Sequence, residues 1–400
     1  MDPIRRAAHV VTPPFMWLAM QLKLFAYRQP LRPLRWVLLE LTQVFDFAMV
    51  FANVQNYAMS INHRLFGGDF LFGKAVMVTG HARALEEIPH IRLRGSRFMG
   101  VPMVAGDPGV FVTNAGPITT SQPARRVLRE HMNREIVSDW LTSPDYPTLQ
   151  ARCADILADW KASPQMASMF GVRGTSTRIM VRLLSGQDLP AAQAEAVTRA
   201  YFFRFGEHTL FGYYAPFVLG LLGTRERMRR DAYRPLQDLG IDELRIDMVL
   251  FAAMFSLGTI VIKCLEYARR YDVDWSGLTH DERVRFVIET QRLYPTVTSV
   301  HRILERPEEV VIRGKRVRLY PGEEIAYPFV AINRDPAVFA EPDEFRLDRP
   351  QSEVDAVLSW STGFHACPVK DLSILVTVLQ LDALAERGDL RALSFFNIEV

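Results

Sequence analysis

The feature that most constrains the fold of this chain is a short loop at residues 360–368, which leads into its last helical stretch. The loop reads Trp-Ser-Thr-Gly-Phe-His-Ala-Cys-Pro. Gly363 permits a tight turn, because glycine enters backbone conformations that other residues avoid. The apolar spacing that follows predicts a helix over residues 369–386, and Pro368 suits its first position, where no backbone donor is needed. Cys367 therefore lies where the N–H groups of a helix start would favour a thiolate.

Two interpretations of this cysteine are open on the residues alone. It can be a buried thiol in an ordinary turn, because cysteine is among the most buried residue types. It can also be a metal ligand, since the loop resembles the cysteine-ligand loop of the cytochrome P-450 superfamily, Phe-Gly-x-Gly-x-His-x-Cys-x-Gly. Gly363, His365 and Cys367 match that pattern. Three positions depart from its Phe, its first Gly and its last Gly: Trp360, Ser361 and Val369.

Motifs upstream of the loop carry the same resemblance. Glu289-Thr-Gln-Arg292 places an acid and a base on one helix face, where they can form an ion pair. The segments that follow resemble, in order, the superfamily's sheet and two of its later motifs: a β-rich stretch over 297–327 with a hairpin around 313–315, Asn-Arg-Asp-Pro at 333–336, and Phe-x-x-x-Arg at 345–349. In this resemblance Glu289, Arg292 and Arg349 form a structural charge triad behind the cysteine loop.

The resemblance implies a mainly α fold with a smaller β-rich part, as one cytochrome P-450-like domain over residues 1–400. It also implies one haem b (iron protoporphyrin IX) as the cofactor. Composition agrees with a globular protein of this size, with 49% hydrophobic and 23% charged residues. No repeat or linker divides the chain, and no Gly-x-Gly-x-x-Gly indicates a built-in nicotinamide or flavin module.

The resemblance assigns the cofactor-binding residues one by one. Cys367 is the proximal iron ligand, and Arg302 and His365 match positions that contact haem propionates, where charge-assisted hydrogen bonds satisfy a carboxylate. Arg126, in a helix predicted over residues 120–135, comes nearest to a further basic propionate contact. A solvated basic helix face is the alternative for Arg126.

The longest apolar helical candidate, residues 241–270, contains no proline and predicts a buried central helix without a kink. Oxygen-activating members of the resembled family carry an acid followed by an alcohol in this helix, which deliver protons. Here no carboxylate lies between Asp247 and Glu266. Ser256 and Thr259 are the candidate catalytic hydroxyls. The alternative is that both bond back to carbonyls one turn earlier, as such residues often do inside helices.

Three functions stay open at this point. The family default is a monooxygenase that oxidises a lipophilic small molecule with electrons from an external redox partner. The alternative is a peroxide-driven peroxygenase or a hydroperoxide-rearranging enzyme, which the missing acid favours because such chemistry needs no proton relay. A non-catalytic haem-binding protein is the third.

Charge and cysteine usage limit the partners and the compartment. The net charge of +2 gives no indication of nucleic-acid binding. Three cysteines without paired or zinc-like spacing fit a reducing cytoplasm, and no secretory signal is evident. Residues 36–54 are apolar but carry acidic side chains, which argues against a spanning helix. We expect a cytoplasmic protein, with peripheral membrane contact through the N-terminal region as an open alternative. The prolines at 13 and 14 predict short helices there.

Overall fold

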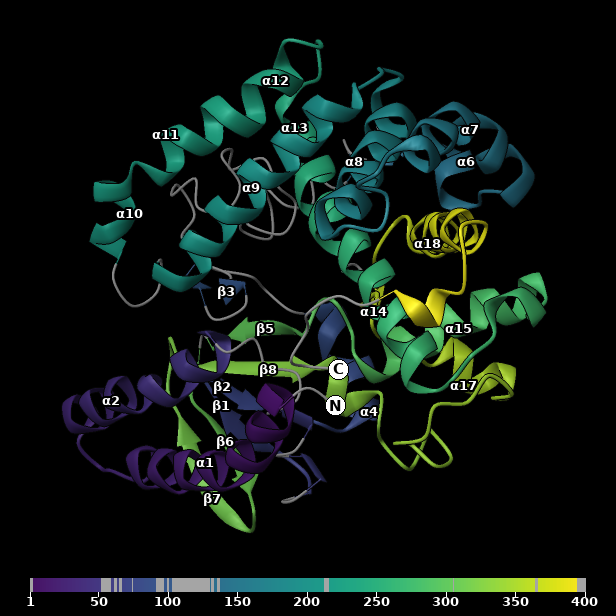
Figure 1. Ribbon diagram of the computed structural model, residues 1–400. Coiled ribbons are helices and arrows are strands. Elements are labelled where there is room, and N and C mark those ends of the chain that lie inside the picture. The colour runs from purple at the N-terminus through teal and green to yellow at the C-terminus, as the bar shows by residue number, and fades with distance from the viewer. Residues whose placement is uncertain are drawn as a thin grey trace.

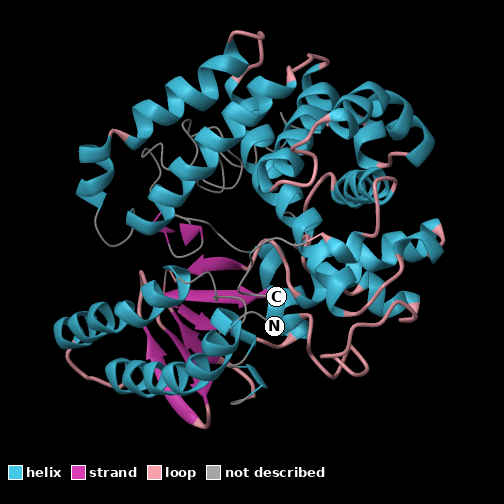
Figure 2. Cartoon of the chain, in the orientation of Figure 1, coloured by secondary structure: helices cyan, strands magenta, loops and turns pink. Residues whose placement is uncertain are grey.

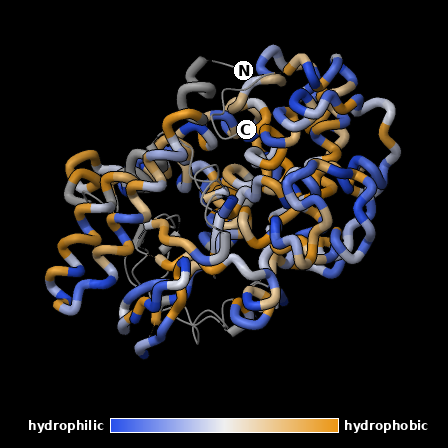
Figure 3. The backbone as a smooth tube through the Cα atoms, turned by 90° about the horizontal axis from the view of Figure 1, so that it is seen from below, coloured by the Kyte–Doolittle hydropathy of each residue, from blue (hydrophilic) through white to orange (hydrophobic). Residues whose placement is uncertain are grey.

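The computed structural model describes residues 3–393 apart from 52–58, 61–62, 65–66, 74, 91–96, 99–100, 103–129, 131–132, 135–136, 212–215, 305 and 364–365. A large helical part and a smaller sheet part lie against each other (Figures 1 and 2). The predicted fold class, mainly α with a β-rich part, is confirmed. Hydrophobic and hydrophilic residues both occur along most helices in Figure 3, as expected for helices with one buried face.

The sheet part brings together strands from both ends of the chain. Its four-stranded sheet has the order β1 (Phe70–Phe72), β2 (Ala75–Met77), β8 (Glu324–Pro328), β5 (Ser299–Ile303). Only β2 and β8 pair in parallel. This register joins an N-terminal hairpin to the segment that follows the Glu-x-x-Arg helix.

The predicted hairpin is β6 (Glu308–Ile312) and β7 (Lys315–Leu319). Arg313 has φ 52° and Gly314 has φ 72°. Two central residues with positive φ define the type I′ turn, whose twist matches that of the flanking strands. Two long helices, α1 (Pro3–Tyr27) and α2 (Arg32–Phe51), pack as a hairpin beside this sheet part (Figure 1).

The helical part surrounds one central helix, which runs as α13 (Glu243–Asp247), η3 (Met248–Leu257) and α14 (Gly258–Arg270). The long helices packed around it are α8 (Met169–Ser185), α9 (Ala191–Phe211), α15 (His280–Leu293) and α18 (Lys370–Ala385), and α7 (Tyr146–Ala162) packs against α8 and α18. The remaining described elements are short: α4 (His81–Glu87), η1 (Ile88–His90), β3 (Arg97–Phe98), β4 (Val101–Pro102), α6 (Asp139–Thr142), α10 (Pro216–Leu222), α11 (Thr224–Met228), η2 (Arg229–Tyr233), α12 (Arg234–Gln237), η4 (Trp275–Gly277), α16 (Phe329–Ile332), α17 (Gln351–Asp355) and η6 (Leu390–Ala392).

One carboxylate ties α18 to its neighbours. Asp382 accepts hydrogen bonds from the Tyr146 hydroxyl, from Trp275 Nε1 at 2.8 Å and from Arg283 Nη1 at 3.0 Å. These donors come from α7, η4 and α15, so the helix that follows the cysteine loop is fixed at its far end by three elements. One helix of the described part, Arg245–Arg270, is long and apolar enough to cross a membrane, but 75% of its apolar window is buried within the protein, as in a core helix.

Two local predictions are wrong. The chain does not break into short helices at Pro13 and Pro14, because α1 continues through both and buries Met16 and Met20 against the sheet part. The central helix is not uniformly α-helical either. Its segment Met248–Leu257 is a π-helix, for which the sequence offers no proline or other breaker.

Candidate functional site

The cysteine loop closes tightly on itself ahead of α18. The backbone N–H of Cys367 donates to the carbonyl of Trp360 at 2.8 Å, and the Cys367 side chain is half-buried. Gly363 has φ 57°, and a Cβ at this position would lie 2.7 Å from Cβ of Pro89. Only glycine fits there, for both reasons. The helix begins at Lys370 with Val369 as its N-cap, so the prediction that Pro368 takes the first helical position is wrong.

Ser361 stands where the resembled pattern has its first Gly, and its backbone keeps the conformation of a glycine. Its φ is 64°, in the left-handed region that glycine enters without steric cost. Its hydroxyl oxygen is buried and has no hydrogen-bond partner. The pattern's glycine at this position therefore has a conformational reason, and this chain tolerates serine in the same conformation. The neighbouring Trp360 donates from its indole to Ser373 Oγ of α18 at 2.8 Å, which ties the loop to the helix.

The other two cysteines do not compete as metal ligands. Burial raises the pKa of the Cys153 thiol to about 11 and that of the Cys264 thiol to about 12. Both are fully buried in the helical core. A metal ligand must be a thiolate that the metal can reach, so the half-buried Cys367 stays the candidate for this role.

The predicted ion pair behind the loop is present and fully buried. Arg292 and Glu289 are 0% and 3% exposed, and they pair through Nε–Oε2 at 2.7 Å and Nη2–Oε1 at 2.8 Å. The other three N–H groups of Arg292 donate to backbone carbonyls at 2.7–2.9 Å: those of Asn333, Pro342 and Glu344. All five donors of this guanidinium are therefore satisfied, which is what a buried arginine requires.

Arg349 completes the triad from the other side. Its Nε donates to Glu289 Oε1 at 2.9 Å, and its Nη1 pairs with Glu353 at 2.6 Å. Its remaining N–H groups donate to the carbonyls of Ala340, Glu341 and Glu344. Two guanidiniums thus bind the segment over residues 333–349 to α15.

The side chains of Asn333 and Ser359, whose contacts sequence reasoning did not predict, connect this cluster to the cysteine loop. Asn333 Nδ2 donates to Ser359 Oγ at 2.9 Å, and Ser359 Oγ donates to the carbonyl of Gln291 at 2.6 Å. The backbone N–H of Leu358 donates to Asn333 Oδ1 at 2.9 Å. The Asn-Arg-Asp-Pro motif was the signal for Asn333, but a motif alone does not say which loop its side chain holds.

Of the three residues predicted to contact haem propionates, the structure describes only Arg302. Arg302 lies on β5, where it pairs with Glu308 at 2.6 Å and Glu87 at 3.3 Å. Its Nε is buried and has no hydrogen-bond partner. Arg126 and His365 lie outside the described residues. The residues present therefore fit a thiolate-ligated haem at two points, the Cys367 thiol and the unpartnered Arg302 N–H, which could donate to a carboxylate.

The π-helical segment of the central helix is held by a buried arginine on α8. Arg173 Nη1 donates to the carbonyls of Met254 at 2.9 Å and Phe255 at 3.0 Å, and Nη2 donates to Thr259 Oγ1 at 2.9 Å. A helix that returns from π to α geometry leaves a carbonyl without an intrahelical donor, and Arg173 supplies donors at that point. A Cβ at Gly258 would lie 2.5 Å from Arg173 Cγ, so glycine is needed beneath the guanidinium.

The candidate catalytic hydroxyls lie within this arrangement. Thr259 Oγ1 donates to the carbonyl of Phe255 at 2.6 Å while it accepts from Arg173. Ser256 is half-buried. The nearest acids of the helix are engaged with other partners, Asp247 with the Tyr233 hydroxyl and Glu266 with Arg269. Burial lowers the pKa of Arg173 to about 10.

Aromatic rings cover the adjacent face of the central helix. The ring of Phe205, from α9, lies 4.4 Å from that of Phe255 and 6.2 Å from that of Phe251 between centroids. The described side chains pack on one another here, so they form an apolar wall next to the π-helical segment.

Comparison with known proteins agrees with this geometry. The cytochrome P-450 family model matches residues 284–377, which hold Glu289, Arg292, Arg349 and Cys367. The matched segment therefore resembles the cytochrome P-450 superfamily, and the relatives and solved structures support the same family. The cytochrome P-450 fold extends well beyond the matched segment: a thermophilic cytochrome P-450 from Sulfolobus tokodaii superposes with a TM-score of 0.57 at 15% identity, over 82% of this chain and 91% of that one. A myxobacterial cytochrome P-450 in complex with myristic acid gives a TM-score of 0.57 at 16% identity, over 84% and 90%.

Sequence similarity to curated proteins is confined to short segments. Biflaviolin synthase from Streptomyces coelicolor is 36% identical over 80 residues, which is 20% of this chain and 18% of the synthase. Linoleate diol synthase from Gaeumannomyces graminis is 31% identical over 101 residues, 23% of this chain and 8% of that protein. The chain thus spans under a fifth of the length of either relative.

Proposed function

We propose that this cytochrome P-450 is a haem-thiolate oxidoreductase that oxidises a lipophilic small molecule. The observation that supports it best is Cys367, half-buried in a loop that a fully satisfied arginine–glutamate cluster fixes from behind. Bound haem b would supply the iron at which O–O bonds are cleaved, which an axial thiolate favours. Cys367 would ligate the iron, and the Nε–H of Arg302 would donate to a propionate, with His365 as a second propionate contact. Phe205, Phe251 and Phe255 would exclude water and contact the apolar substrate.

The oxidant is the second part of the proposal. Activation of molecular oxygen requires delivered protons, and Thr259 donates its only proton to the carbonyl of Phe255. Asp247 and Glu266 pair with Tyr233 and Arg269. This arrangement favours an oxidant that is already reduced, a peroxide or a lipid hydroperoxide, over reductase-driven monooxygenation, which is the family default.

The names of similar proteins suggest which substrates to test first. The relatives include linoleate 10R-lipoxygenase from Aspergillus fumigatus, 27% identical over 111 residues, and the linoleate diol synthase described above. Long-chain fatty acids and their hydroperoxides therefore belong in the first panel, beside terpenes and polyketides.

Two experiments test the proposal. Purified protein, once reduced and exposed to carbon monoxide, should show the absorption typical of thiolate-ligated haem; Cys367→Ala should lose this spectrum, and Cys153→Ala should keep it. A histidine-type spectrum from folded protein would contradict Cys367 as the ligand. Turnover of the lipid panel is then compared with peroxide and with reductase plus oxygen. Turnover by the reductase route alone would refute the peroxide proposal, and a thiolate spectrum with no turnover on either route would indicate a non-catalytic haem protein.

A further inference from the structure

The N-terminal hairpin of α1 and α2 exposes most of the large apolar side chains found on the described surface. Seventeen such side chains are exposed among the described residues, and twelve of them lie between Val10 and Val44. Two are tryptophans, with Trp17 51% and Trp36 63% exposed. Single exposed apolar residues are normal on a soluble protein, but a contiguous group of this size marks an interaction surface.

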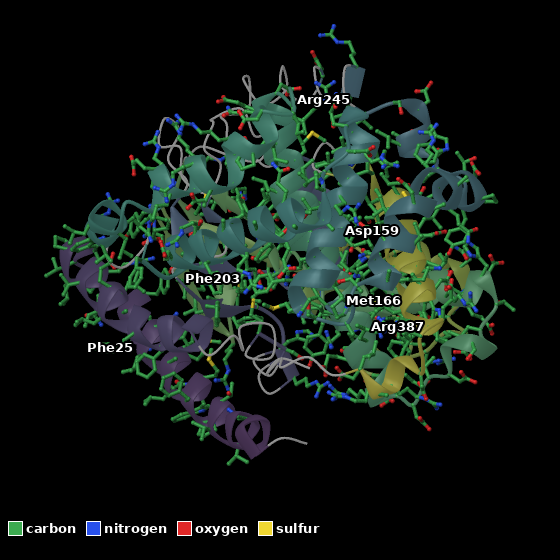
Figure 4. All side chains as sticks on the ribbon, turned by 45° about the horizontal axis from the view of Figure 1, so that its top comes forward. Phe25, Asp159, Met166, Phe203, Arg245 and Arg387 are labelled. Carbon is green, nitrogen blue, oxygen red and sulfur yellow. The ribbon has the colours of Figure 1, made fainter. Side chains whose placement is uncertain are left out.

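The pattern along α1 shows that the exposed group is a helix face. Met16, Met20 and Leu24 are buried on the side of the sheet part. Leu18 and Phe25 are exposed on the other side, at helical spacing, and Figure 4 labels Phe25 at the outer edge of the hairpin. A surface helix normally has one apolar face and one polar face. A helix that is apolar on both faces needs a second apolar medium or partner on the outside.

The rim of this face is cationic. Residues 3–39 contain no aspartate or glutamate. Of their lysine and arginine residues, Lys23 and Arg35 are buried, and Arg35 pairs with Glu323, so neither belongs to the rim. Arg28 and Arg32 are exposed at the turn between the two helices. Arg318 of β7 meets Arg32 at the ring of Tyr320, where the two guanidiniums lie 5.8 and 5.0 Å from the ring centroid. The exposed Lys315 and Arg316 continue the basic rim along the β6–β7 hairpin, which contacts α1.

We propose that the α1–α2 face, named here the hairpin face, docks on a lipid bilayer that contains anionic lipids. An amphipathic helix with tryptophan and leucine on its apolar side and arginine at its border is typical of a segment that lies in the membrane interface. A second copy of the chain would bring the same cationic rim against itself, whereas anionic headgroups complement it. The inference is independent of the reaction proposed for the haem site, because it uses none of the residues of that site.

The experiment measures binding of the full haem-loaded chain to vesicles by co-sedimentation and by the blue shift of tryptophan emission. Vesicles of phosphatidylcholine alone are compared with vesicles containing about one-third phosphatidylserine. The combined change Trp17→Gln and Trp36→Gln should lower partition to the anionic vesicles by about tenfold or more. Leu85→Gln removes an apolar side chain exposed on α4 and is the matched control, which should bind as the parent protein does.

Charge is tested separately from apolar contact. The combined change Arg28→Glu and Arg32→Glu should reduce binding to anionic vesicles to the level seen with phosphatidylcholine alone. Arg28→Lys with Arg32→Lys keeps the charge and should preserve binding. The proposal would be overturned if the parent protein bound neither vesicle type. It would also be overturned if the parent protein bound no vesicles but formed a concentration-dependent dimer that the tryptophan substitutions disrupt. An intact haem spectrum in each variant shows that the fold is retained, so loss of binding is assigned to the hairpin face.

Discussion

Removing Glu289 should destabilise this protein more than removing either of its arginine partners. Glu289 accepts hydrogen bonds from Arg292 and Arg349, and both guanidiniums are almost completely buried. Glu289→Ala therefore leaves two buried cations without their shared carboxylate. Arg292→Ala leaves Glu289 with Arg349 and the backbone N–H of Arg346, at 2.9 and 3.0 Å.

The magnitude follows from these contacts. Breaking one buried ion pair by removing a partner costs about 3–5 kcal/mol. We expect about that loss of unfolding free energy for Arg292→Ala, and a larger one for Glu289→Ala. Since a domain's whole stability is about 5–15 kcal/mol, Glu289→Ala should yield little folded, haem-loaded protein. Arg292→Lys should not restore stability, because lysine has three donors and the five oxygen atoms that accept from Arg292 would not all be paired. Each buried acceptor left unpaired costs about 1–3 kcal/mol.

The assay is the melting temperature by circular dichroism together with the haem-to-protein ratio after purification. Arg346→Ala is the matched control, because its side chain forms surface pairs with Asp348 and Glu341, worth about 0–1 kcal/mol at most. Its backbone N–H still reaches Glu289 in the variant. Normal haem content and melting temperature in both Glu289→Ala and Arg292→Ala would refute the reasoning, since a buried and fully satisfied cluster cannot be dispensable.

Three further outcomes follow from the loop and the central helix. Ser361→Gly should raise the free energy of unfolding by about 1 kcal/mol, because it relieves a left-handed backbone conformation and removes a buried unpaired hydroxyl; a lower melting temperature would contradict this. In haem-free protein at about pH 8, iodoacetamide should label Cys367 and spare Cys153 and Cys264, whose raised pKa values keep them as thiols; mass spectrometry locates the label, and added haem should protect Cys367. Thr259→Ala should keep most peroxide-driven turnover while it costs about 1 kcal/mol of stability, because Arg173 loses one acceptor; selective loss of peroxide-driven turnover would show that this hydroxyl does act on the oxidant.

The parts of the fold that sequence predicted are those governed by local pattern. The β6–β7 turn follows from Arg313-Gly314. The α15 helix also follows from local signals, because Thr279 and Glu282 form a capping box at its start. The Glu289–Arg292 pair was predicted from spacing and position, and its burial is confirmed. The cofactor roles of Cys367, Arg302, His365 and Arg126 stay predictions, as do those of Ser256 and Thr259.

The parts that sequence missed depend on partners far along the chain. The π-helical segment of the central helix cannot be read from its own residues, because it depends on Arg173, which lies more than eighty positions away from Thr259. Arg173 is one of three arginines in the helix 169–185, and nothing in the spacing of α8 says which of them meets the carbonyls of the central helix. The need for glycine at position 258 also depends on a distant partner. A Cβ there would lie 2.5 Å from the Arg173 side chain, and the sequence around Gly258 does not show this contact.

The central helix and the cysteine loop differ in how this chain departs from the family pattern. At the loop, Ser361 occupies a glycine position and keeps the glycine's left-handed backbone, so the substitution changes stability and leaves the path of the chain alone. At the central helix, the missing acid is accompanied by a different hydrogen-bond network, in which a guanidinium from α8 takes the carbonyls and the hydroxyl of the π-helical segment. A cation at this point opposes the arrival of further protons, because a positive charge raises the cost of protonating its neighbours. In our proposal Cys367 serves as the thiolate ligand, and the two carboxylates of the central helix, Asp247 and Glu266, are engaged with Tyr233 and Arg269. This difference between the loop and the helix is the physical basis for proposing a reduced oxidant.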